Sequence, residues 1–112
     1  MKAKDSQCPA EFTLSMIGGR WKIPIVFHLM AGRKRFSELA RALTGVTQKM
    51  LTQQLRVMER NGLVARKLYP QVPPKVEYSL TELGASLQPV VEAMCVWGEQ
   101  HGGKGLSLSA PL

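Results

Sequence analysis

The sequence has few of the residues that build disulfide frameworks or metal sites. Its 112 residues contain two cysteines and two histidines, and these four stand alone at Cys8, His28, Cys95 and His101. Zinc sites and secreted disulfide scaffolds group their cysteines and histidines at short spacing, so we expect neither, and no cofactor. The apolar runs stay below the roughly 18 residues that cross a bilayer, so we expect no membrane contact.

Patterns typical of secretion and of common enzymes are also missing. Residues 1–12 lack the apolar core of a secretory signal, and we therefore expect a cytoplasmic protein. The chain contains no Gly-rich phosphate loop, no GxSxG motif and no pair of carboxylates arranged for acid–base work. We expect a protein that is not an enzyme. Its length fits one domain, residues 1–101, followed by a turn-rich, flexible tail at 102–112.

Acidic residues are scarce in the middle of the chain. Residues 20–75 hold twelve of the fifteen Lys and Arg but only two of the eight acids, Glu38 and Glu59. The flanking segments are mildly acidic, although the whole chain carries +7. A basic centre of this kind favours a surface that binds a polyanion, although a generically basic domain would give the same count.

The hydrophobic periodicity predicts a mainly helical chain with one β-hairpin. Proline and glycine positions, together with capping residues, set the expected boundaries. We expect helices at 11–17, 21–30, 38–43 (after an N-cap at Ser37), 48–60 (after Thr47) and from 82 onward (after Thr81, with a bend at Pro89), and strands at 63–69 and 76–80 around a proline-rich loop. Pro24 is the awkward residue, because the second helix must start late or bend there.

The segment TQKMLTQQLRVMERNGLV, residues 47–64, has two distinct sides. Leu51, Leu55 and Met58 recur at helical spacing and form one apolar stripe. The other side carries amides, hydroxyls and cations and almost no acid. The base edges of the DNA major groove present donors and acceptors that such groups can read, whereas a carboxylate would meet phosphate repulsion. This side therefore predicts a DNA-recognition helix.

The order of elements is that of a winged helix-turn-helix. Two helices joined by the tight turn at Gly45-Val46 precede a hairpin, and the second of them would enter the major groove. Phosphate contacts position such a protein, and base contacts specify the sequence. The candidate DNA-binding residues are Arg35, Ser37, Thr47, Gln48, Lys49, Thr52, Gln53, Arg56, Arg66 and Lys75, with Arg33, Lys34 and Lys67 as further cations nearby.

Two other functions compete with DNA binding. A winged helix can recruit a protein partner, in which case the basic face would be incidental. An RNA-binding protein is less favoured, since only Tyr69 and Tyr78 lie in the hairpin and no aromatic stacking platform results. The sequence leaves the first alternative open.

Four stretches together resemble HxlR-type transcriptional regulators, which are relatives of the MarR group. They are CPAEFTLSMIGGRWKIPIVFHL, RFSELARAL, GVTQKMLTQQLRVMERNGLVARKLY and PPKVEYSLTELGASLQPVVEAMCVWG, and the resemblance covers about residues 8–98. It implies a homodimer that represses or activates promoters and binds a roughly palindromic operator. Its first and last helices would form the dimer interface, with Phe12, Met16, Val91, Met94 and Trp97 as candidates.

The resemblance also draws attention to Cys8. Several HxlR-type regulators sense oxidants or electrophiles through a cysteine at this position. Cys8 precedes Pro9 at an expected helix N-terminus, where the positive end of the helix dipole favours a thiolate. We expect Cys8 to be a redox or electrophile sensor, although a half-buried thiol with no function fits the same position. Cys95 is expected to pack, and the sequence does not decide whether the two cysteines pair.

Overall fold

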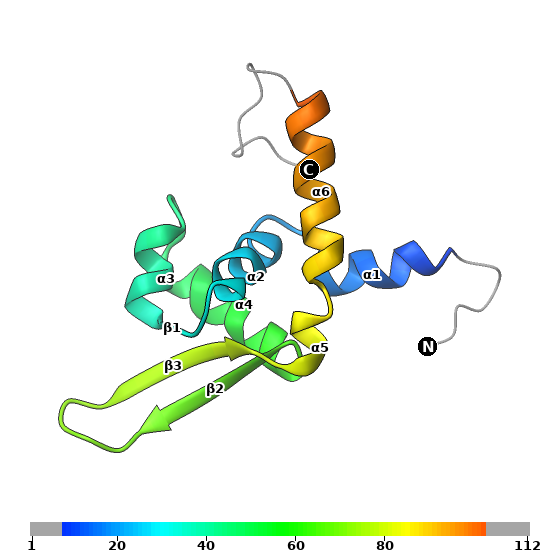
Figure 1. Cartoon of the computed structure of the whole chain (residues 1–112). Coiled ribbons are helices and arrows are strands. Elements are labelled where there is room, and N and C mark those ends of the chain that lie inside the picture. Colours follow the sequence, from blue (N-terminus) through cyan, green and yellow to red (C-terminus); the bar gives the residue numbers. More distant parts are fainter. Residues whose placement is uncertain (1–7, 103–112) are drawn as a thin grey trace.

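The computed structural model describes residues 8–102, which form a helical body with a protruding hairpin (Figure 1). Most of the expected flexible tail, residues 103–112, lies outside the described residues. The elements in chain order are α1 (Pro9–Ile17), α2 (Lys22–Met30), β1 (Lys34–Arg35), α3 (Phe36–Ala42), α4 (Gln48–Arg60), β2 (Val64–Tyr69), β3 (Lys75–Leu80), α5 (Glu82–Ala85) and α6 (Gln88–His101). The mainly helical class with a small hairpin, expected from the sequence, is confirmed.

One apolar core holds the body together. It is contributed by α2, α3 with its C-cap, α4, the base of the hairpin and a single residue of α6. Its members are Ile25, Val26, Leu29, Leu39, Leu43, Leu51, Leu55, Met58, Leu63, Val64, Tyr78 and Val91. Each fully buried aliphatic side chain of this kind stabilises the fold by about 1.5–3 kcal/mol relative to exposure. No buried polar or charged residue interrupts this core within residues 8–102.

Pro24 lies in the first turn of α2. It is the third residue of the helix, where a backbone N–H has no intrahelical partner to lose. The first helical hydrogen bond here runs from the Ile25 N–H to the Trp21 carbonyl at 3.0 Å. The helix therefore starts at Lys22, one residue later than expected.

The helix before the tight turn begins earlier than the sequence predicted. Ser37 is not its N-cap: the cap position is Arg35, and Ser37 lies exposed in the first turn of α3. The Arg35 N–H donates to Glu38 Oε1 at 2.7 Å. Glu38 is the third residue of α3, and its carboxylate accepts from the backbone N–H of the cap residue, as the acidic member of a capping box does.

The sheet has three antiparallel strands in the order β1-β3-β2. β2 and β3 form the predicted hairpin, in register from Val64 opposite Leu80 to Tyr69 opposite Lys75. The two-residue strand β1 was not predicted, and it pairs with β3 at Tyr78 and Glu77. Its pairing ties the entrance of α3 to the hairpin, so the sheet fixes how the hairpin stands on the helical body.

The single C-terminal helix that was predicted is two helices. Thr81 Oγ1 does accept from the Gly84 N–H at 3.0 Å, but the helix that it caps, α5, ends at Ala85. A new helix, α6, then starts at Gln88 with Pro89 in its first turn. Pro89 therefore begins a helix and does not bend one, as suits a residue without a backbone N–H.

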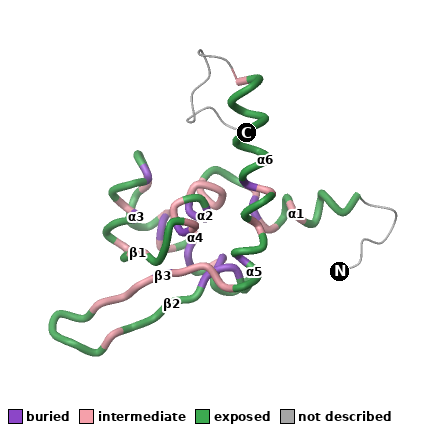
Figure 2. The backbone as a smooth tube through the Cα atoms, in the orientation of Figure 1, coloured by how far each residue is buried: buried purple, intermediate pink, exposed green. Residues whose placement is uncertain are grey.

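Helices α1 and α6 extend away from the body (Figure 1). The tube in Figure 2 is exposed along most of α1 and along α6 from residue 92 to 101. Across residues 8–102, every helix falls short of the length and apolar character that crossing a bilayer requires.

Candidate nucleic-acid interface

Helix α4 separates its polar and apolar residues as the sequence predicted. Leu51, Leu55 and Met58 are completely or almost completely buried in the core. The expected DNA-binding residues lie on the other side and together line one shallow depression of about 480 Å³: Gln48, Lys49, Thr52, Gln53 and Arg56. This depression is a polar surface open to solvent, because four of the five residues are exposed and Thr52 is half-buried.

Both ends of α4 are held firmly. Thr47 Oγ1 accepts from the Met50 N–H at 3.0 Å, which confirms the predicted cap. At the other end, Gly62 has a φ of +80°, a conformation that glycine adopts without strain. Gln54 accepts from Lys22 Nζ at 2.9 Å and so links α4 to α2. This link was not foreseen from the sequence, since the two residues are far apart in the chain.

A groove of about 520 Å³ runs between α4 and the hairpin. Its polar lining comes from Gln48, Thr52, Arg56 and Glu59 on α4 and from Arg66 on β2. Its apolar lining is Phe36, Val76 and Tyr78. The groove brings the predicted residues Arg56 and Arg66 together across the gap, and Glu59 is the one lining residue with a negative charge.

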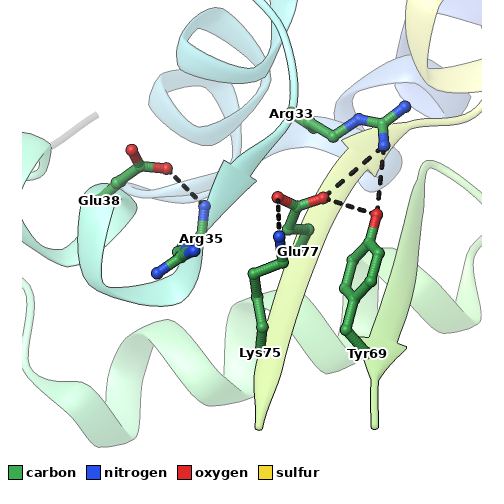
Figure 3. A network of polar contacts seen from close by, with 6 residues as sticks. All are labelled: Arg33, Arg35, Glu38, Tyr69, Lys75 and Glu77. Carbon is green, nitrogen blue, oxygen red and sulfur yellow. Dashed lines mark hydrogen bonds and ion pairs between the residues drawn. The ribbon is translucent and has the colours of Figure 1, made fainter. Parts of the chain in front are cut away.

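The opposite face of the hairpin carries a polar network centred on Glu77 (Figure 3). Tyr69 Oη donates to Glu77 Oε1 at 3.0 Å. Arg33 Nη1 lies 3.4 Å from Tyr69 Oη and 3.7 Å from Glu77 Oε1, and Lys75 Nζ lies 3.7 Å from Glu77 Oε2. The ammonium groups of Lys75 and Lys67 also lie over the Tyr69 ring, 4.4 and 5.0 Å from its centre.

The network keeps Glu77 ionised. The hydrogen bond from Tyr69 is the main cause that lowers the pKa of the Glu77 carboxyl below its ordinary value of 4.5, and the charges of Lys75 and Arg33 act in the same direction. Partial burial opposes them. Lys75, which was predicted from the sequence to bind DNA, is therefore already paired with a carboxylate.

Two of the other candidate residues lie at the entrance of α3. The side chains of Arg35 and Ser37 are exposed. Arg35 stands opposite Glu77 in the strand register, but its guanidinium points away from the carboxylate (Figure 3). Both residues are separate from the depression on α4, and neither lines the groove.

Residues 16–105 match the family described as the HxlR-like helix-turn-helix. The chain belongs to this family. The resemblance expected from the sequence is thereby confirmed, and the protein is a regulator of transcription and not an enzyme.

Several relatives of this HxlR-family chain carry names that agree with this assignment. It is 54% identical over 94 residues to the HTH-type transcriptional regulator YybR of Bacillus subtilis, covering 84% of this chain and 75% of that protein. It is 55% identical over 95 residues to the regulator YkvN of the same organism, covering 85% and 80%.

Solved structures of winged helix-turn-helix regulators have the same fold. The reduced form of the redox regulator HypR superposes with a TM-score of 0.82 at 53% identity, covering 85% of this chain and 94% of that one. The reduced form of the transcriptional regulator YodB from B. subtilis gives a TM-score of 0.76 at 40% identity, covering 88% and 99%.

The predicted dimer-interface residues of this HxlR-family chain fall into two groups. Phe12, Met94 and Trp97 are exposed on the projecting helices, with 49%, 44% and 65% of their surface accessible. Met16 is half-buried against the core, and Val91 is completely buried within it. Val91 is therefore no surface residue: α6 packs against α2 there and uses Val91 to anchor itself to its own body. Leu14 and Val96 are further exposed apolar residues that were not predicted from the sequence.

The two cysteines of the chain are free and exposed. Cys8 occupies the N-cap position of α1, directly before Pro9, as predicted. Cys95 does not pack into the protomer, contrary to the expectation, because α6 has left the body at that point. No three His, Cys, Asp or Glu residues gather as a metal site in the described part of the chain.

Proposed function

We propose that this chain is a cytoplasmic, homodimeric regulator that binds double-stranded DNA in a sequence-specific way. The observation that carries the proposal is the orientation of α4: its amides, hydroxyls and cations face solvent, and its apolar stripe is buried. Gln48, Lys49 and Gln53 lie in the first half of the helix, the part from which helix-turn-helix proteins contact base edges. Amide side chains there suit the donor and acceptor pair of adenine, and Lys49 suits the acceptors of guanine.

The groove between α4 and the hairpin gives Arg56 and Arg66 a different role. When a recognition helix lies in the major groove and a wing in the adjacent minor groove, the strand that separates the two grooves must pass between them. Arg56 and Arg66 line that passage from its two sides and Thr52 adds a hydroxyl, so two cations face the single carboxylate of the lining, Glu59. We assign these three residues to the phosphate backbone, which positions the protein without reading sequence.

The apolar residues on α1 and α6 support a dimer. Phe12, Leu14, Met94, Val96 and Trp97 are large side chains that remain exposed on two projecting helices. Exposed apolar groups of this kind mark interaction sites. A two-fold axis through these helices would place two copies of α4 about one helical turn apart, which requires a roughly palindromic operator.

Cys8 supports a redox response of the same protein. Its thiol is exposed at the start of α1, on one of the helices assigned to the dimer, and two solved neighbours are the reduced and oxidised forms of the redox regulator HypR. When the Cys8 thiols of two copies form a disulfide, an oxidant such as diamide takes up the two protons and two electrons released. The new bond alters the relative position of the two subunits and thereby the affinity for DNA.

A gel-shift experiment with the whole chain tests the proposed function. The probe is a duplex selected by this protein from a random-sequence pool, and unlabelled nonspecific DNA is present in excess. We expect a retarded complex with two subunits per duplex, and its loss after diamide treatment in the original chain but not in Cys8→Ser. Absence of any selected sequence would favour a protein-binding winged helix. Equal loss in Cys8→Ser would contradict the sensor role alone.

A further inference from the structure

Glu77 is the one acid in the hairpin segment, residues 63–80, and it lies among cations. Its carboxylate contacts Tyr69 Oη through a hydrogen bond and lies 3.7 Å from both Arg33 Nη1 and Lys75 Nζ. Lys67 stands opposite Glu77 in the register, and its ammonium lies over the Tyr69 ring. A carboxylate at a DNA-binding surface repels phosphate, so its presence in this cluster requires a reason.

The strand register places this cluster on the far face of the hairpin from α4. Side chains alternate along a strand, and directly paired residues of antiparallel strands share a face. Arg66 and Tyr78 form one such pair on the α4 side and line the groove. Lys67, paired with Glu77, therefore lies on the other side. A hairpin in the minor groove has one DNA strand on each side, so this second face meets the second strand.

The geometry points to Glu77 as a carboxylate that competes with DNA phosphate for the cations Arg33 and Lys75. In the free protein it holds Arg33 and Lys75, and in the complex these two cations turn to the backbone of the second strand. The inference rests on the proposed function, because it requires the hairpin to lie against DNA. It assigns to Glu77 the role of a positioning residue that sets how many wing cations are free to bind.

The contact distances are consistent with such an exchange. Arg33 is 61% exposed at its side chain, and both ion pairs are longer than a good hydrogen bond. An exposed cation such as Arg33 gains only about 0–1 kcal/mol from such a pair, so a phosphate can replace the carboxylate there. Lys75 and Glu77 are 24% and 18% exposed, so this second pair is more shielded and Arg33 is the cation that exchanges more readily. The hydrogen bond from Tyr69 is the closer contact, and it keeps the carboxylate in place when the cations leave.

Salt dependence separates competition from a purely structural role. Each cation that reaches a phosphate releases a counterion and steepens the slope of log K against log salt by roughly 0.9. In the original chain a carboxylate that has lost its cations attracts a counterion again and reduces this slope. Glu77→Gln removes the charge but keeps an oxygen that can accept from Tyr69.

The test compares Glu77→Gln with Tyr69→Phe and with Glu92→Gln, which makes the same change of charge on α6. Affinity is measured for one duplex over a range of salt concentrations, and retention on a heparin column is measured in parallel. We expect Glu77→Gln to bind DNA about two- to tenfold more tightly than Glu92→Gln. Its salt slope should be steeper by up to roughly 1, and it should elute later from heparin. Tyr69→Phe should not bind more tightly.

Two results would overturn the competitor role. Weaker binding by both Glu77→Gln and Tyr69→Phe would mean that the network only supports the shape of the wing. Binding by Glu77→Gln equal to that of Glu92→Gln would mean that Glu77 does not restrain Arg33 and Lys75 in the original chain.

If Glu77→Gln lowers the melting temperature, a double-mutant cycle with Lys75→Gln decides the question. The loss of affinity from Lys75→Gln must be larger in the Glu77→Gln background than in the original chain, and an equal or smaller loss rejects the role. If the original chain binds no duplex but heparin retention still differs as expected, the proposed function fails while the competition for a polyanion stands.

Discussion

Helices α4 and α6 are of similar length, but they differ in how far their apolar residues are buried. All three apolar residues of the α4 stripe are buried in the body, Met50 and Val57 beside the stripe are half-buried, and the residues exposed on the helix are polar. Helix α6 buries Val91 alone and leaves Met94, Val96 and Trp97 exposed. The protomer alone buries the apolar stripe of α4, whereas it leaves most of the large apolar side chains of α6 exposed.

The difference indicates what each helix meets. The outer face of α4 has hydrogen-bonding groups and positive charge, which match the edges of bases and the phosphate backbone. The outer part of α6 has large apolar side chains, which match another apolar surface. The core of the protomer thus supports two unlike surfaces, one for DNA and one for a second copy.

The largest expected effect comes from breaking the apolar side of this comparison. Met94→Ala combined with Trp97→Ala should raise the dissociation constant of the dimer by more than about 100-fold, since a buried tryptophan anchor at an interface is worth roughly 2 kcal/mol or more and the loss of a buried methionine side chain adds to it. DNA affinity should fall with it, because one recognition helix cannot span two half-sites. Sedimentation measures the first effect and gel shift the second.

The matched control on α6 is Glu92→Ala combined with Glu99→Ala. These exposed residues project from the side of the helix opposite Met94 and Trp97, since each lies two positions from one of those residues and five from the other. Val96, which is on the side of the two glutamates, is left unchanged in both variants. The control should remain a dimer. A Met94/Trp97 double variant that is still dimeric at micromolar concentration would reject α6 as the interface.

The next effect concerns the groove beside α4. Arg56→Ala combined with Arg66→Ala should lower the salt slope by roughly 2 and reduce binding to all duplexes, specific or not, to a similar degree. Arg56→Lys combined with Arg66→Lys keeps both charges and should keep most of the slope. An unchanged slope in the alanine pair would mean that no DNA strand passes through the groove.

A smaller and more selective effect is expected at the start of α4. Gln48→Ala and Gln53→Ala should each cost about 1–3 kcal/mol of discrimination at one base pair of each half-site. Nonspecific affinity and the salt slope should stay as they are, because neither residue carries charge. Competition with a set of single-base operator variants measures the loss. A uniform loss over all variants would instead assign these amides to the backbone.

The smallest effect tests the support of α4 and not its surface. Thr47→Ala removes the hydroxyl that accepts from the Met50 N–H, which should lower the free energy of unfolding by about 0.5–2 kcal/mol. Thr47→Ser retains the acceptor and should retain most of the stability. Chemical denaturation measures both. If both variants are equally unstable, the methyl group and not the cap is responsible.

The parts of the fold that depend on local pattern were predictable from the sequence. The bounds of α4, its Thr47 cap and its buried stripe were all predicted, because helical spacing and capping depend on residues that are close together in the sequence. The hairpin was predicted for the same reason, since alternation and a proline-rich loop mark it locally.

The parts that depend on distant contacts were not predictable. The strand β1 exists only because it pairs with β3 more than forty residues later, and the N-cap of α3 is Arg35, the last residue of this strand, and not Ser37 as predicted. The burial of Val91 depends on α2, and the network of Glu77 joins Arg33 to Lys75. The distribution of charge along the sequence predicted that Lys75 binds DNA, and it did not indicate the ion pair with Glu77.

Whether the polar face of α4 enters the major groove can be decided by protection of guanine N7 from dimethyl sulfate on a duplex selected by the protein, because this atom lies in that groove. Two clusters of protected guanines about 10 base pairs apart are predicted, both lost when Gln48, Lys49 and Gln53 are changed to alanine. A stable complex in which these guanines stay reactive would show that α4 docks elsewhere, and would contradict the proposed mode of DNA binding.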